Sequence, residues 1–160
     1  MSADGDPADV ALERVALGDR RAQSLEAALI AEMTHRYGAG GPGPVAAAGF
    51  DPPEGCFLLA VAEGRPVGCG GFRRLGPDRA EIKRMYVDPS VRGLGVGRRL
   101  LRGLEDGAAV AGYREVWLET GTEQPEALGL YVSAGYVAVP PYGEFRDDPR
   151  SLCFKRTLGT

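Results

Sequence analysis

The sequence has little of the side-chain chemistry that builds metal centres and hydrolytic triads. It contains one histidine, His35, and three cysteines that show no C-x-x-C spacing. A zinc-type site needs three or four such ligands, so we expect no metal. A G-x-S-x-G nucleophile elbow is also missing, which argues against a serine hydrolase. An odd number of scattered cysteines is typical of reduced thiols and predicts a cytoplasmic protein.

Long apolar runs and an excess of positive charge are absent as well. No run approaches the roughly 18 residues of a membrane span, and the acidic, polar first residues do not resemble a secretory signal. The formal net charge is -3, whereas general nucleic-acid binders usually carry a basic footprint. We therefore expect neither a membrane nor a nucleic-acid partner. The length suits one domain, predicted at residues 9–160 after a flexible tail at residues 1–8.

The hydrophobic pattern changes between helical spacing and short strands. It predicts helices at residues 20–36, 95–111 and 125–135. It predicts strands at residues 10–15, 56–62, 67–72, 80–87, 114–120, 136–139 and 151–158. The strands at 80–87 and 114–120 flank a helix, so they should be parallel, and the strands before them antiparallel. A glycine-rich segment at 38–44 is expected to be a loop that covers the substrate.

A glycine-rich stretch, "VRGLGVGRRLL" at residues 91–101, is the strongest local signal. Glycine turns that open a helix are suited to hold phosphate. The dinucleotide fingerprint G-x-G-x-x-G fails, because Arg98 stands where the third glycine belongs. The Walker loop fails too, because no lysine follows the glycines. The pattern R-x-x-G-x-G remains, and it is matched by Arg92, Gly93, Leu94, Gly95, Val96 and Gly97.

The wider segment "AEIKRMYVDPSVRGLGVGRRLLRGLE" resembles the cofactor segment of the GNAT N-acetyltransferase superfamily. The segments "VWLETG", "QPEALGLYVSAGY", "PPYGEF" and "SLCFKRTL" follow in the order typical of that family. The resemblance implies a single-domain α/β (α+β) fold. Its mixed, mostly antiparallel sheet would have six to seven strands, about four flanking helices and a central β-α-β unit with splayed parallel strands. It implies acetyl-CoA as cofactor and leaves a homodimer open.

The same resemblance assigns residues to the cofactor. Backbone groups of Met85, Tyr86 and Val87 would bond the pantetheine arm. The amides from Gly93 to Arg98 would hold the pyrophosphate, with Arg92 and Arg98 adding charge. Gln124 stands where many relatives have an asparagine that contacts the cofactor.

Two side chains are candidates for proton transfer. By resemblance, Tyr131 is the general acid that protonates the thiolate; its alternative is a buried core tyrosine. Glu81 occupies the position of a catalytic base in several relatives, and it is expected to share one side of its strand with Lys83 and Met85. Its alternative is a surface ion pair. Glu119 is a second candidate, which could hold a cationic substrate before deprotonation; its alternative is an ion pair with a nearby arginine.

The acceptor pocket is expected between the first predicted helix and the loops at 38–55 and 140–150. Its candidate residues are His35, Tyr37, Glu119, Tyr142 and Glu144. The expected reaction is direct transfer of an acetyl group to a primary amine, with a small-molecule acceptor preferred over a protein amine. A non-catalytic acyl-CoA sensor and a dinucleotide-binding reductase are the rival interpretations.

Overall fold

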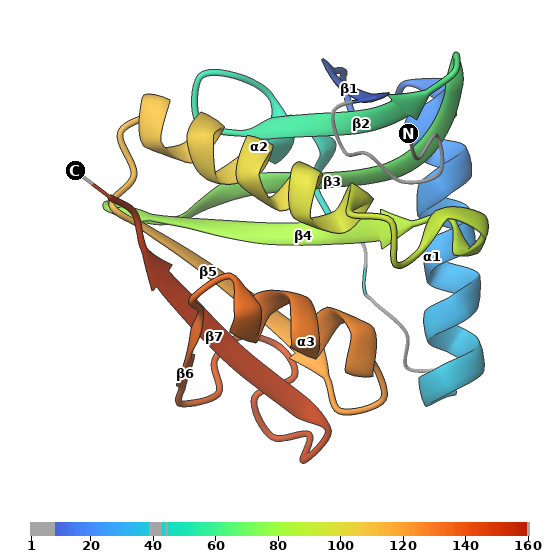
Figure 1. Ribbon diagram of the computed structural model, residues 1–160. Coiled ribbons are helices and arrows are strands. Elements are labelled where there is room, and N and C mark those ends of the chain that lie inside the picture. The colour runs from blue at the N-terminus through green and yellow to red at the C-terminus, as the bar shows by residue number, and fades with distance from the viewer. Residues whose placement is uncertain (1–8, 39–42, 44, 160) are drawn as a thin grey trace.

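The protein folds around one seven-stranded sheet, which matches the predicted strand count (Figure 1). The computed structural model describes residues 9–38, 43 and 45–159. The predicted tail at 1–8 and most of the glycine-rich segment at 38–44 lie outside this part. In spatial order, the strands are β1 (Val10–Arg14), β2 (Cys56–Ala62), β3 (Arg65–Gly76), β4 (Arg79–Val87), β5 (Glu115–Gly121), β7 (Ser151–Thr157) and β6 (Val137–Val139).

Helices cover both faces of this sheet, as Figure 1 shows. Helix α1 (Arg20–Tyr37) packs on one face, and α2 (Val96–Val110) and α3 (Pro125–Ser133) pack on the other. Successive residues of β2 point to opposite faces, so Leu58 joins the cluster under α2 and Leu59 the cluster under α1. This alternation explains why β2 is apolar along its length. None of the described helices has the length and apolar character to cross a membrane.

The helix content differs slightly from the expected four. The described residues contain three α-helices and two short 3-10 turns, Ala47–Phe50 and Pro89–Val91. The segment that follows α1 carries several glycines and prolines, including Pro52 and Pro53. These residues disfavour helical backbone, and the described part of this segment forms only a 3-10 turn.

The predicted parallel pair, β4 and β5, is confirmed, and it is paired over a short length only. Residues 79–82 of β4 pair with residues 115–118 of β5, and all other neighbours in the sheet are antiparallel. Beyond Ile82 and Leu118 the two strands separate, as Figure 1 shows on the side of α1 and α3. The splayed strands expected from the resemblance are therefore present, and they position the site.

Strand β4 contains a bulge that corrects one prediction. Lys83 pairs with Gly71, but Tyr86 pairs with Cys69, so Arg84 and Met85 together oppose a single residue. Arg84 adopts a left-handed backbone with φ 63°. A bulge shifts the alternation of side chains, so Met85 does not share a side with Lys83. It lies instead against Gly70 and the cluster under α2.

Candidate active site

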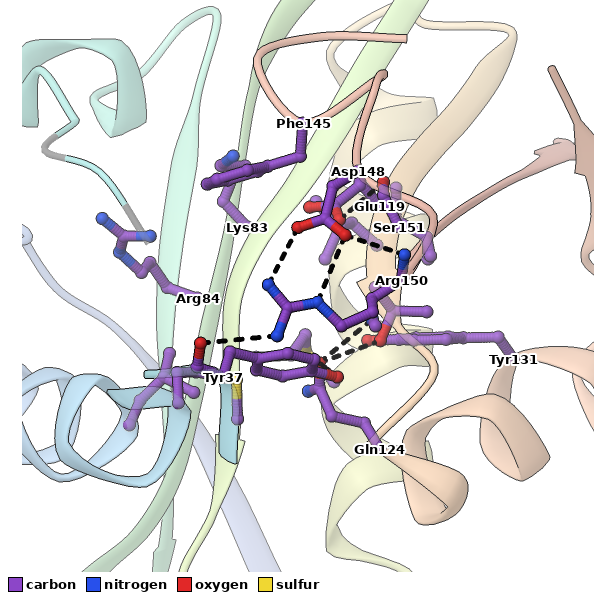
Figure 2. A pocket seen from close by; sticks show the side chains of 17 residues that line it. Tyr37, Lys83, Arg84, Glu119, Gln124, Tyr131, Phe145, Asp148, Arg150 and Ser151 are labelled. Atoms are coloured by element: carbon purple, nitrogen blue, oxygen red, sulfur yellow. Dashed lines mark hydrogen bonds and ion pairs between the residues drawn. The ribbon is translucent and has the colours of Figure 1, made fainter. Parts of the chain in front are cut away.

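Two adjoining hollows occupy the region where β4 and β5 separate. The larger has a volume of about 550 Å³ and extends from the start of α2 to α3. The smaller, about 150 Å³, lies between α1, the two strands and residues 145–151, and Figure 2 shows it from close by. The residues that line both hollows are Leu29, Met85, Gln124 and Tyr131. The hollows therefore meet at these four side chains.

The start of α2 has the backbone geometry of an anion cradle. Gly95 precedes the helix with φ 91°, and no side chain caps it. The amide of Arg99 donates to the Gly95 carbonyl at 3.0 Å. The amides of residues 96–98, which precede Arg99, have no carbonyl acceptor within the helix, as at any helix start. These N–H groups and the positive end of the helix dipole face the larger hollow and suit a pyrophosphate.

The two arginines of the cradle have different surroundings. Arg92 donates to the Val87 carbonyl at 2.8 Å and to Glu32 of α1 at 2.7 Å, and its guanidinium lies over the Tyr86 ring. It therefore links the loop to α1 as well as lining the hollow. Arg98 donates to the Ser133 hydroxyl of α3. Met85, Tyr86 and Val87 also line the larger hollow, so their backbone lies where the resemblance places the pantetheine arm.

Tyr131 stands where the two hollows meet. The side chain is almost fully buried, and its ring packs beside that of Tyr136. Within the described residues its hydroxyl has no hydrogen-bond partner, and Figure 2 shows it directed from α3 toward the middle of the pocket. Burial raises the pKa of the Tyr131 phenol, so the phenol stays protonated at neutral pH. A proton donor is thus held at the junction.

Gln124 organises the turn between β5 and α3. Its amide oxygen accepts from the Gly121 amide at 3.1 Å and from the hydroxyls of Thr120 and Tyr37 at 3.4 Å. Tyr37 also accepts from the Glu123 amide at 2.9 Å. The tyrosine approaches so closely that a Cβ on Gly121 would lie 1.9 Å from its hydroxyl oxygen. The glycine is therefore required for Tyr37 to reach the site.

The two candidate bases are placed differently. Glu81 is buried and does not line the acceptor hollow: Arg73 donates to its Oε1 at 3.2 Å and Tyr142 to its Oε2 at 3.0 Å. Glu119 lines the hollow and accepts one hydrogen bond of 2.9 Å, from the Ser151 hydroxyl. Desolvation raises the pKa of the Glu119 carboxyl above its usual range, and the nearby charge of Lys83 opposes that shift.

The structure places only some of the remaining predicted acceptor residues in the small hollow. Tyr37 lines the small hollow, whereas Tyr142, Glu144 and His35 do not. Tyr142 donates to Glu81, and Glu144 and His35 are exposed. The lining residues that the sequence did not single out for the pocket include Leu29, Met33, Lys83, Phe145, Arg150 and Ser151. Three of them belong to the segment at 145–151, close to residues that were singled out. An irregular loop has no periodic pattern, so only the structure shows which of its side chains point into the pocket.

These parts together suit a protein that holds an acyl-CoA in the larger hollow, beside a second, smaller pocket. The match to a family model agrees: residues 22–136 match the acetyltransferase (GNAT) family. The chain therefore belongs to this family and is an acyl-CoA-dependent N-acyltransferase, with acetyl-CoA as its donor. The prediction of fold, cofactor and enzyme class is confirmed, and the reductase interpretation is excluded.

Individual relatives are consistent with this assignment. The chain is 39% identical to the IAA acetyltransferase of Azospirillum brasilense over 107 residues, 66% of this chain and 70% of that protein. It is 40% identical to the N-alpha-acetyltransferase RimI of Mycobacterium tuberculosis over 90 residues, 54% of this chain and 55% of that protein. A solved structure from Klebsiella pneumoniae, described as an acyl-CoA N-acyltransferase, shares 28% identity. It covers 94% of this chain and 98% of its own, with a TM-score of 0.79.

Metal-ligating side chains are not gathered in this site. Among the described residues, no group of three or more His, Cys, Asp or Glu side chains lies close enough to hold a metal ion. The three cysteines, all described, are free and buried in separate parts of the fold.

Proposed function

We propose that this enzyme acetylates the primary amine of a small molecule. The observation that carries the proposal is the position of Tyr131 where the two hollows meet, with Glu119 lining the smaller one. An amine held beside Glu119 would lie next to the junction at which the acetyl group is presented. The smaller hollow is about 150 Å³, which suits a compact acceptor better than a folded protein surface.

When bound, acetyl-CoA supplies an acetyl thioester whose carbonyl carbon forms a new bond to the amine nitrogen as the bond to sulfur breaks. The amides at the start of α2 hold the phosphates, and the bulge in β4 leaves backbone groups near Met85 outside the strand ladder. A backbone N–H released in this way can stabilise the carbonyl oxygen as it becomes negative. The protein therefore contributes both orientation and electrostatic stabilisation.

Two proton transfers complete the reaction. The Tyr131 hydroxyl would give its proton to the departing sulfur. The phenolate would then regain a proton through solvent, which balances the proton given up by the amine, because burial disfavours the phenolate. The proton lost by the amine passes to Glu119, whose raised pKa makes it a stronger base than an exposed carboxylate. Glu81 is the second candidate and would act only through water or through Tyr142, because its two oxygens are engaged.

The homodimer that the resemblance leaves open stays a prediction. Three buried, unpaired thiols suit a reducing compartment, and we place the activity in the cytoplasm on that ground.

The test is the rate of thiol release from acetyl-CoA with a panel of amines, with the mass of each product measured. The panel contains amino acids, polyamines, aminoglycosides and peptides with free N-termini. Acetylation of a small amine well above that of any peptide supports the proposal. Preferential acetylation of the peptides would make the chain a protein N-acetyltransferase and overturn the small-molecule assignment.

A further inference from the structure

Two opposite charges line the acceptor hollow without pairing with each other. Lys83 on β4 and Glu119 on β5 directly follow Ile82 and Leu118, the last residues at which these two strands pair with each other. The two side chains therefore face each other across the point where the strands separate. No salt bridge within 4.0 Å joins them, and Lys83 has no ion pair with any described residue. The hollow thus offers one cation and one anion a short distance apart.

The other charges around the hollow are already paired. Arg84 binds Glu26 at 3.0 Å, and its second contact is the Gly43 carbonyl. Arg150 donates to both carboxylate oxygens of Asp148, at 3.2 and 3.1 Å, as Figure 2 shows. A ligand would have to break these pairs to use their charges. Lys83 is the cation that can bind a ligand without breaking an ion pair.

The rest of the wall is mainly apolar. Leu29 and Met33 enter from α1, and Phe145 comes from the loop on the other side. In Figure 2 Phe145 and Lys83 lie at the same end of the pocket. An acceptor that fills this space therefore needs an apolar part beside its charged groups.

We propose that the acceptor is an α-amino acid with an apolar side chain, whose carboxylate is bound by Lys83 while its amine lies against Glu119. This inference rests on the proposed function and names its substrate class. An α-amino acid carries both charges on one carbon, so a single molecule can satisfy both side chains. The apolar side chain then contacts Leu29, Met33 and Phe145.

Other amines fit the same charges poorly. A peptide N-terminus has an amide where the amino acid has its carboxylate, so Lys83 would face no negative partner. A polyamine would place a second cation near Lys83 and be repelled. Lysine suits a small carboxylate as a compact point charge, whereas arginine would impose a planar, bidentate geometry. The recognition of a free carboxylate is therefore the distinguishing property of the site.

The experiment compares leucine and phenylalanine with their amides and with the corresponding amines that lack the carboxylate. Initial rates of thiol release are measured at equal concentrations of unprotonated amine. For the wild-type enzyme we expect kcat/KM for each amino acid to exceed that of its two analogues roughly 10- to 100-fold, as for a charged hydrogen bond. Lys83→Met should abolish this preference by raising KM for the amino acids, with KM for acetyl-CoA unchanged.

Lys155→Met is the matched control, because Lys155 is the chain's other lysine and pairs with Glu115 outside the hollow. It should keep the wild-type preference. Equal or better acetylation of the amides or the shortened amines, or a preference retained in Lys83→Met, overturns the inference while amine acetylation itself stands. If none of the six compounds and no amine of the wider panel is acetylated, the proposed function fails together with it.

Discussion

Arg84 and Glu26 form an ion pair that joins the bulge of β4 to α1, with Arg84 Nε 3.0 Å from Glu26 Oε2. The Arg84 side chain is 5% exposed, and its backbone lies in the left-handed region. A left-handed backbone is unfavourable for a residue with a Cβ, so the surrounding contacts must hold it. The pair therefore fixes both walls of the acceptor hollow, because Arg84 and α1 line it together.

Removing the acid of this pair should cost more stability than removing a surface acid. We expect Glu26→Gln to lower the free energy of unfolding by roughly 3 kcal/mol, because it leaves a buried guanidinium without its counter-charge. Glu13→Gln breaks an exposed pair with Arg21, which solvent screens, and should cost much less stability. Urea unfolding of both variants measures the difference, and equal losses would show that the Arg84 pair contributes little.

A methyl group on Gly121 should disturb the site through Tyr37. The new Cβ would lie 1.9 Å from the Tyr37 hydroxyl, so the tyrosine must move and lose its bonds to Glu123 and Gln124. We expect Gly121→Ala to lower Tm and to raise KM for the amine. Gly129→Ala is the control for Tm and for the amine KM: this glycine of α3 lines the larger hollow and not the smaller one. No atom lies within 4 Å of its added Cβ, and alanine there should stabilise by about 0.5–1 kcal/mol. A Gly121→Ala enzyme with unchanged Tm and KM would contradict the role given to Tyr37.

The fold was largely predictable from local patterns, for reasons that particular elements make clear. The apolar run of β2 and the glycine stretch before α2 encode their structure in short segments, and both were located to within a residue or two. The bulge at Arg84 was not predictable, because it depends on the pairing of β3 with β4 and not on a glycine in β4. Alternation alone therefore placed Met85 on the wrong side of the strand.

The pH dependence of the reaction should report Glu119. Both the amine and the carboxylate must be unprotonated, so kcat/KM should rise more steeply with pH below the Glu119 pKa, which lies above its usual range, than above it. Glu119→Gln should lower the rate about 10²-fold. It should also remove the steeper part of the plot of kcat/KM against pH, so that only the deprotonation of the amine still contributes. Glu81→Gln is measured in parallel. If it is the variant that loses the steeper part, Glu81 is the base.

The same carboxyl should give a signature in stability. Its pKa is raised in the folded state, so folding favours the protonated form, and the charged form costs stability at any pH above the folded pKa. Glu119→Gln removes this cost. We expect the variant to have a higher Tm than the wild type at about pH 7, and the difference to shrink near pH 4, around the carboxyl's ordinary pKa. A lower Tm for the variant at neutral pH would contradict the desolvated position of Glu119.

The role of the α2 start in cofactor binding can be tested by a substitution that strains the backbone at one glycine. Gly95 has φ 91°, so Gly95→Ala should distort the amides that precede the helix and raise KM for acetyl-CoA about tenfold. Gly112→Ala is the matched control, because Gly112 has φ 99° and follows the other end of α2. Both variants should lose similar stability, and only the first should change KM for acetyl-CoA. If both substitutions changed KM for acetyl-CoA equally, the start of α2 would have no specific role in binding the cofactor.

Prediction of the site was less complete than prediction of the fold. Tyr131, Gln124 and Glu119 could be found because each lies next to a recognisable segment of β5 or α3. Lys83 was seen only as a neighbour of Glu81, since the sequence does not show which charges remain unpaired after folding. Charges in irregular loops, such as Arg150, are paired by contacts with Asp148 and Tyr37 that no pattern of spacing encodes.

The most direct test of the account measures thiol release and product mass for the wild type, Tyr131→Phe and Tyr113→Phe at saturating acetyl-CoA and amine. Tyr113 is a buried tyrosine that donates to the Glu54 carbonyl away from both hollows. We expect an acetylated amine from the wild type, a kcat about 10²-fold lower for Tyr131→Phe with unchanged CoA affinity, and a normal kcat for Tyr113→Phe. Tight binding of CoA by the wild type without any acetylated amine, or full activity in Tyr131→Phe, would contradict the proposed reaction.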